Sequence, residues 1–209
     1  AHLSILDAPY FLIPGNHDRR DRLRAAFADL AYLPIKSEFI HYVVDDYPLR
    51  LIALDTVHPG RVGGLLCEDR LEWLEHKLSI NNDKPTIILM HHPPFKTGIE
   101  YMDRTGLANA SSFADIVSKN NQIRLILCGH IHRPIQTNWS GAAVMTAPAT
   151  AHQISLELRS DEQASRIMEP PAIYLHLWGP GGLISHISYI GDYRACSPFS
   201  AGYLASNRN

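Results

Sequence analysis

The chain has 209 residues, of which 45% are hydrophobic and 19% charged, and its formal net charge is −2. These values are typical of one soluble globular domain, or of one domain with a small addition. No basic block is present, so we expect no nucleic-acid polymer as a partner. The apolar runs are far shorter than the roughly 20 residues that cross a bilayer, so we expect no membrane association.

The cysteines predict no disulfide framework. Cys67, Cys128 and Cys196 are odd in number and far apart in the sequence. A reducing cytoplasm is the simplest setting for such a chain. Residues 1–20 lack a basic start followed by a long apolar stretch, so no secretory signal is predicted.

The expected elements alternate between short apolar runs and amphipathic segments, as in a layered α/β protein. In the clearest helix, Leu71, Leu74 and Leu78 share one face, with Glu68 and Asp69 in the first turn. Near the C-terminus, two apolar segments flank a Gly-Pro-Gly-Gly turn and predict a hairpin. In chain order we expect a strand at 10–13, a helix at 22–30, strands at 40–44 and 50–54, the helix around 68–78, a strand at 86–90, a helix at 111–118 with a Ser cap, strands at 125–128 and 142–146, and hairpin strands at 172–178 and 183–190.

Polar residues follow three of these strands directly. In layered α/β folds, ligand sites lie beyond the carboxyl ends of the strands, so we expect the three strand ends to converge on one site. The three segments are Gly15-Asn16-His17-Asp18, His91-His92-Pro93-Pro94 and Gly129-His130-Ile131-His132.

Imidazole nitrogen and amide oxygen are ligands that suit zinc, manganese, iron and cobalt. On a loop, His130 and His132 can reach two different ions. A His-x-His pair alone is a weak signal that more often has a structural explanation. The joint occurrence of three such segments, each at a strand end and in this order, is a strong signal of a metal site.

These segments resemble three of the five signature blocks of the calcineurin-like metallophosphoesterases. Residues 95–103 and 129–153 resemble more closely the bacterial class III 3′,5′-cyclic nucleotide phosphodiesterases and their glycerophosphodiesterase relatives. The resemblance runs from about Pro9 to about Gln153. It implies an α/β fold, namely a four-layer α/β/β/α sandwich of two mixed sheets, here without its N-terminal strands and with a C-terminal β-hairpin.

The chain is divided accordingly into a metallophosphoesterase core at residues 1–160 and a C-terminal hairpin and tail at residues 161–209. The second part is a candidate dimerisation element or cap, so a homodimer is one expected assembly.

The resemblance also implies a binuclear metal centre. Asn16, His91 and His130 would bind one divalent ion, and His132 would bind the other. The ions implied are Mn²⁺, Fe²⁺ or Fe³⁺, Zn²⁺ or Co²⁺.

The implied reaction is hydrolysis of small phosphodiesters such as 3′,5′-cyclic nucleotides (cAMP), by in-line attack of a metal-bound hydroxide. His17 would stabilise the transition state or protonate the leaving alkoxide, and Asp18 would orient His17. A phosphomonoesterase or a broad-specificity phosphoesterase is the alternative enzyme.

Two further blocks of the family pattern, Asp-x-His and Gly-Asp, do not occur ahead of Gly15. The second supplies the carboxylate that bridges the metals, so we expect this chain to bind ions weakly, with one ion or none. We also expect exposed strand edges and apolar surface. Three explanations are open: a fragment of a longer protein, which is favoured; a truncated, non-catalytic protein with a degenerate site; or a core completed by a partner chain.

Several residues have two interpretations. His92 competes with His91 as a ligand, and the position of the following proline favours His91. His152 is either a hydrogen-bonded loop residue or a substrate contact. Asp55 is expected to cap a turn, and Cys128 to be a buried apolar residue. No metal role is expected for Asp7, His2, His41, His58, His76, His176 and His186.

Overall fold

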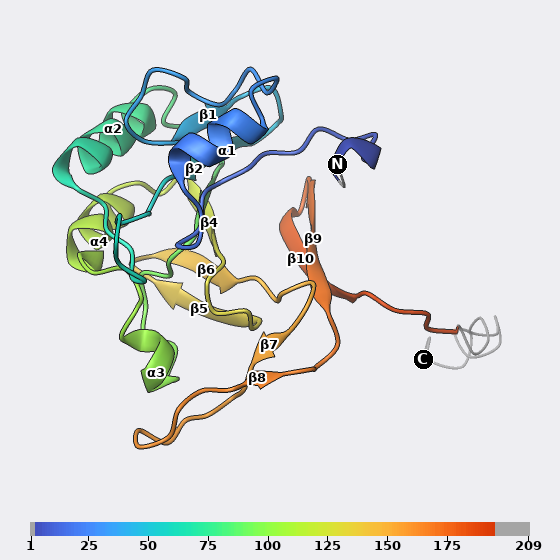
Figure 1. Cartoon of the computed structure of the whole chain (residues 1–209). Helices are drawn as coiled ribbons and strands as arrows, with labels where there is room; N and C mark the ends of the chain where they lie inside the picture. Colours follow the sequence, from blue (N-terminus) through green and yellow to red (C-terminus); the bar gives the residue numbers. More distant parts are fainter. Residues whose placement is uncertain (1–2, 195–209) are drawn as a thin grey trace, which may run out of the picture.

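The computed structural model describes residues 3–194, and at its centre is a six-stranded mixed sheet in the order β1-β2-β3-β4-β6-β5 (Figure 1). Strands β2, β3, β4 and β6 are parallel, and β1 and β5 pair antiparallel at the two edges. The carboxyl ends of four strands therefore meet at one edge of the sheet. The strands are β1 (Tyr42–Val44), β2 (Arg50–Leu54), β3 (Thr86–Met90), β4 (Ile123–Cys128), β5 (Ile135–Trp139) and β6 (Ala142–Thr146).

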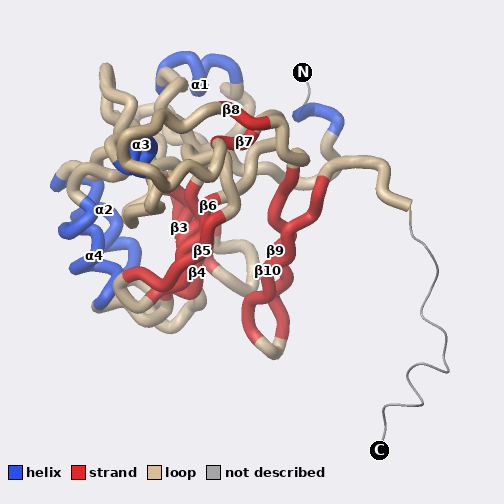
Figure 2. The backbone as a smooth tube through the Cα atoms, turned by 90° about the horizontal axis from the view of Figure 1, so that it is seen from below, coloured by secondary structure: helices blue, strands red, loops and turns tan. Residues whose placement is uncertain are grey.

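Helices and a hairpin lie on opposite faces of this sheet (Figures 1 and 2). Helices α2 (Glu68–Ser79) and α4 (Ala110–Ser118) cover one face, and the hairpin of β9 (Ala172–Gly179) and β10 (Gly182–Tyr189) lies beside the other. This arrangement confirms the α/β class and the C-terminal hairpin. The described residues contain one large mixed sheet, and the hairpin forms the layer on its second face. The remaining elements are a 3-10 helix (Leu3–Ile5), α1 (Arg20–Ala26), α3 (Glu100–Asp103), β7 (Gln153–Ile154) and β8 (Arg166–Ile167).

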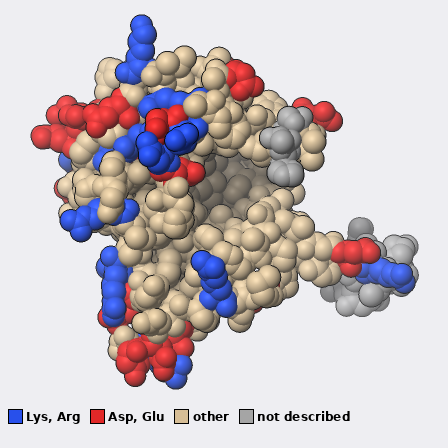
Figure 3. Space-filling view, viewed as in Figure 1, with Lys and Arg blue, Asp and Glu red and all other residues tan. Residues whose placement is uncertain are grey.

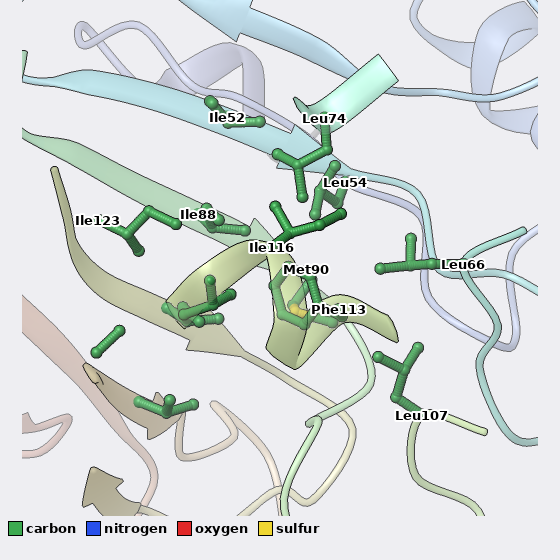
Figure 4. Packing of buried hydrophobic residues seen from close by; sticks show 14 of the residues in the cluster. Ile52, Leu54, Leu66, Leu74, Ile88, Met90, Leu107, Phe113, Ile116 and Ile123 are labelled. Atoms are coloured by element: carbon green, nitrogen blue, oxygen red, sulfur yellow. The ribbon is translucent and has the colours of Figure 1, made fainter. Parts of the chain in front are cut away.

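The parallel strands are apolar on both faces, as a sheet covered on both sides requires. On one face, Ile88 and Met90 pack with Phe113 and Ile116 of α4 in the main core (Figure 4). On the other face, Ile87 and its neighbours contact Tyr174 and Leu183 of the hairpin. The continuous apolar runs in the sequence thus correspond to strands buried on both faces.

The strand predicted at residues 10–13 is wrong. This segment carries no strand pairing. The amide of Leu12 donates to the Tyr32 hydroxyl at 3.0 Å, and the Tyr42 hydroxyl donates to the Leu12 carbonyl at 2.8 Å. Side-chain hydroxyls therefore take the backbone groups that a neighbouring strand would otherwise pair.

Two helix boundaries also differ from expectation. The helix predicted at 22–30 begins at Arg20 and ends at Ala26. Helix α4 follows Asn109 and has no side-chain cap. The carboxamide oxygen of Asn109 instead accepts the Leu66 amide at 3.0 Å, and its nitrogen donates to the Leu66 carbonyl. Asn109 thus links two loops, and the predicted Ser cap is absent.

The division at residue 160 stays a prediction. Strand β7 pairs with β8 across that position, so the two proposed parts share a small sheet.

The hairpin carries exposed apolar side chains, including Leu175 and Ile184, which are 52% and 54% exposed. A hollow with a largely uncharged wall opens in the space-filling view (Figure 3).

In residues 3–194, no helix combines the length and hydropathy of a membrane span. His2, Cys196 and the tail at 195–209 lie outside the described residues.

Candidate metal centre and active site

The ends of β3 and β4 bring two of the predicted segments together. Met90 is in register with Cys128, so the next residues, His91 and Gly129, are neighbours. The Gly129 amide donates to the His91 carbonyl at 3.0 Å. The imidazole rings of His91 and His130 lie 5.2 Å apart, centroid to centroid. The predicted convergence of strand ends is therefore confirmed for β3 and β4.

The third segment reaches the same place from a loop. Asn16 Oδ1 lies 2.9 Å from His91 Nε2, although 75 residues separate them in sequence. The glycines of two segments make room for this contact. A Cβ atom on Gly15 would lie 2.9 Å from His91 Cε1, and one on Gly129 would lie 3.1 Å from His91 Nδ1. Glycine at both positions lets the two backbones approach the imidazole this closely.

A cavity of about 550 Å³ lies over these groups. Five of the six predicted site residues line it, and Asp18 is the exception. Its other walls include an aromatic ring, aliphatic side chains and two arginines. The lining residues are Asn16, His17, Val62, His91, Tyr101, Met102, Arg104, Thr105, His130, His132, His152, Ile154 and Arg166.

His92 is fully buried, and both of its ring nitrogens already have partners. Nδ1 lies 2.8 Å from Thr56 Oγ1, and Nε2 lies 2.9 Å from the Val62 carbonyl. These contacts leave neither ring nitrogen of His92 free to bind a metal ion. His92 therefore packs behind the cavity, and the geometry favours His91 as the available imidazole.

The loop after β4 holds both of its histidines in an unusual backbone conformation. The φ angles of His130 and His132 are +65° and +50°, in the left-handed region that residues other than glycine seldom adopt. His130 Nε2 lies 3.1 Å from Thr105 Oγ1. His132 Nδ1 is buried and has no hydrogen-bond partner. A strained backbone and an unpaired buried nitrogen are features typical of a ligand site.

Burial keeps these imidazoles neutral. It lowers the pKa of His91 to about 3, and the neighbouring histidines act in the same direction. Burial likewise lowers the pKa of His130 to about 4 and depresses the pKa of His132. A metal ligand must be the neutral imidazole, so this environment suits a cation. In the described residues the cluster of His91, His92 and His130 includes no carboxylate.

His17 and Asp18 differ in their environments. His17 lines the cavity beside Asn16. The Asp18 carboxylate accepts the Gly15 amide at 2.8 Å and thus closes the turn of its own segment. Within residues 3–194 it makes no hydrogen bond to His17. This contact shapes the loop that carries His17, and the role of Asp18 in orienting His17 stays a prediction.

The structure places the residues for which two interpretations were open, and the role of His152 stays undecided between them. His152 lies 4.9 Å from His132, ring centroid to ring centroid, and lines the cavity. Asp55 accepts the Val57 amide at 2.9 Å, as a turn cap does, and is also bound by an arginine. Cys128 is buried, which raises the pKa of its thiol. His41 stacks on Trp73 and takes no part in the cavity.

Sequence reasoning missed Thr56, Thr105 and the two arginines of the cavity, Arg104 and Arg166. Thr56 and Thr105 hydrogen-bond two of the clustered histidines. No local pattern marks such residues, because an isolated Thr or Arg in a loop is ordinary. Only the position of Thr56 just beyond the end of β2 could have marked it, because β2 runs parallel beside β3 and the two strands end at the same edge of the sheet.

The calcineurin-like phosphoesterase family model matches residues 1–134, a range that includes all three segments. A probable glycerophosphodiester phosphodiesterase of Arcobacter nitrofigilis is 39% identical over 199 residues, covering 94% of this chain and 72% of that protein. A glycerophosphodiester phosphodiesterase of Enterobacter lignolyticus is 34% identical, covering 83% and 63%. A 3′,5′-cyclic adenosine monophosphate phosphodiesterase of Escherichia coli is 33% identical, covering 70% and 51%.

The similarity to the Arcobacter protein extends past residue 153, where the resemblance was expected to end. A dimetal phosphatase from Danio rerio shares the fold, with a TM-score of 0.53 and 17% identity over 64% of this chain and 59% of that one. The chain therefore belongs to the calcineurin-like phosphoesterase family, a family of hydrolases that includes the phosphodiesterases named above.

Proposed function

We propose that this chain hydrolyses small phosphodiesters at a divalent metal centre. The observation that carries the proposal is the single cavity lined by Asn16, His17, His91, His130 and His132, which come from three separate segments of the chain. Asn16, His91 and His130 would hold one ion, and His132 would contribute to a second. The unpaired buried Nδ1 of His132 and the neutral imidazoles support this assignment.

Bound divalent ions supply positive charge to phosphoryl oxygens and a nucleophilic water near neutral pH. The chain's own residues would do the rest. His17 would hold a proton at the oxygen that leaves when the ester P–O bond breaks. The Asp18 carboxylate, bound to the Gly15 amide, would keep the His17 loop in its turn. Arg104 and Arg166, which line the cavity, would favour an anionic substrate.

The names of the relatives support a phosphodiester as substrate. One is named for glycerophosphodiesters and another for cyclic AMP. A cavity of about 550 Å³ suits a molecule of that size. We propose small phosphodiesters of these two kinds, with phosphomonoesters as the alternative.

A hydrolysis assay tests this proposal. Bis-p-nitrophenyl phosphate, cyclic AMP, a glycerophosphodiester and p-nitrophenyl phosphate are compared with and without Mn²⁺. Asn16→Ala and His17→Ala are run beside the parent chain. We expect Mn²⁺-dependent release from the diesters, a smaller rate with the monoester, and loss of turnover in both variants.

One observation favours a second candidate, a non-catalytic protein with a degenerate site. In the described residues the histidine cluster has no carboxylate to balance the charge of two cations. That candidate predicts weak Mn²⁺ binding without turnover of any ester. Turnover that survives both substitutions would contradict both candidates.

A further inference from the structure

Arg20 and Asp55 form a buried ion pair beside the candidate centre. Arg20 Nε donates to Asp55 Oδ2 at 2.5 Å, and a terminal guanidinium nitrogen donates to Oδ1 at 3.0 Å. The Arg20 and Asp55 side chains are 14% and 0% exposed. The same guanidinium also donates to the Val57 carbonyl at 2.8 Å. This fork connects the end of the Asn16–His17 segment to the carboxyl end of β2.

The carboxylate of Asp55 uses both oxygens fully. Besides Arg20, Oδ2 accepts the Ile40 amide and Oδ1 accepts the Val57 amide, each at 2.9 Å. Arg70 donates to the backbone carbonyl of Asp55 at 2.9 Å. Four N–H donors, two from Arg20 and one each from the Ile40 and Val57 amides, thus hold the Asp55 carboxylate, and it can act as a fixed anchor. A turn cap alone would need only the Val57 contact.

The Asn16–His17 loop depends on such an anchor more than the other two segments do. His91 and His130 follow directly on β3 and β4, whose backbones are held in the sheet. The residues before Gly15 have no strand pairing; they are held by the two tyrosine hydroxyls at Leu12 and by packing of Phe11 and Ile13. After the loop, the chain enters α1 at Arg20. On this side of the loop, the first side-chain connection to the end of a sheet strand is the Arg20–Asp55 pair.

We propose that Arg20 and Asp55 are positioning residues that hold Asn16 and His17 over the cavity. They touch neither the substrate nor the ions, and they act by fixing the loop between Leu12 and α1. The inference rests on the proposed function for its kinetic consequence. Its structural part, the fixing of the loop, is independent of any reaction.

The chain contains a matched control at the other end of β2. Arg50 makes the same forked contact with Asp45, at 3.0 and 3.1 Å, and also donates to the Lys77 and Ile80 carbonyls. The Arg50 side chain is 3% exposed. It lies at the amino end of the strand, away from the cavity. Arg20→Lys and Arg50→Lys each keep the charge and lose the fork.

The test compares these two variants with the parent chain in three measurements: unfolding by urea, hydrogen exchange of a peptide spanning residues 12–22, and kinetics with bis-p-nitrophenyl phosphate and Mn²⁺. Both variants should lose stability. Only Arg20→Lys should exchange faster in that peptide. It should also lower kcat about ten- to hundredfold, the scale of a misplaced catalytic group, while KM changes less. Arg50→Lys should keep the parent exchange and kcat.

Equal exchange and equal kcat in the two variants would overturn the proposal. If the parent chain hydrolyses nothing, the proposed function fails, and the exchange comparison still decides whether the pair fixes the loop. If Arg20→Lys does not fold, the double variant Arg20→Met with Asp55→Asn removes both buried charges, and the carboxamide oxygen can still accept one of the two backbone amides that Asp55 holds. It should fold and show the same faster exchange, and parent-like exchange in it would equally overturn the proposal.

Discussion

The hydroxyl of Thr56 lies 2.8 Å from Nδ1 of His92, and both side chains are completely buried. Thr56 follows β2, and His92 follows β3. Together with the Val62 carbonyl at Nε2, this pair fixes the imidazole behind the cavity. Two adjacent histidines thus have different tasks: His92 supports the wall, and His91 faces Asn16.

Substitution of each histidine by alanine should separate these tasks. His92→Ala removes the imidazole from Thr56, which keeps only the backbone amide of residue 92, leaves the Val62 carbonyl without its partner and opens a cavity. The free energy of unfolding should therefore fall by about 2–4 kcal/mol. His91→Ala should lower kcat/KM by about 10²–10³-fold, the effect of losing one electrostatic stabiliser, with a smaller change in stability. Urea unfolding and diester hydrolysis measure the two effects. The reverse pattern would assign the ligand role to His92.

The space around the His91 ring gives a second prediction. In Gly15→Ala the new Cβ would lie 2.9 Å from His91 Cε1, so the ring or the loop has to shift. We expect the affinity for Mn²⁺ to fall and kcat to fall about tenfold or more, because geometry at the reacting centre is sensitive to shifts of an ångström. Isothermal titration and the diester assay measure both.

The control for that substitution is Gly179→Ala in the hairpin. No atom lies within 4 Å of a Cβ built there. This variant should match the parent chain in affinity and rate. Parent-like behaviour of Gly15→Ala would mean that His91 tolerates displacement.

How far the sequence predicts this protein depends on the range of the interactions concerned. Strands such as β2 and β6 were predicted to the residue, because their apolar runs are buried on both faces. The convergence of His91 and His130 followed from the position of polar residues at the ends of two such strands. The strand at 10–13 was wrong because its backbone bonds to tyrosine hydroxyls 20 and 30 residues away.

The left-handed backbone at His130 and His132 and the Arg20–Asp55 pair were beyond the reach of sequence patterns. Both depend on contacts across the fold. A motif names the groups that meet in a site, but the contacts that hold them come from residues without a motif. Thr56, Thr105 and Asp55 are examples.

The half-buried His41 predicts a dependence of stability on pH. Burial lowers its folded-state pKa from 6.5 to about 4, and Nδ1 has no hydrogen-bond partner. Between pH 6.5 and 4 the unfolded chain therefore binds more protons than the folded one, and stability falls as the pH falls. His41→Phe keeps an aromatic ring on Trp73 and removes this proton. In that window the slope of unfolding free energy against pH should decrease by an amount that corresponds to at most one bound proton. An unchanged slope would mean that His41 is protonated in the folded protein.

The tyrosine contact at Leu12 gives the last prediction. The Tyr42 hydroxyl donates to the Leu12 carbonyl at 2.8 Å, and the side chain is buried. Tyr42→Phe keeps the ring in its cluster and leaves the carbonyl without its donor, which should lower stability by about 1 kcal/mol. Tyr47→Phe is the matched control, because Tyr47 is 39% exposed and makes no hydrogen bond within residues 3–194. Hydrogen exchange should increase at residues 10–13 in Tyr42→Phe alone. Because Arg20 still anchors the other end of the loop, kcat should fall less than in Arg20→Lys. A larger fall would make the tyrosine contact the principal anchor of Asn16 and His17.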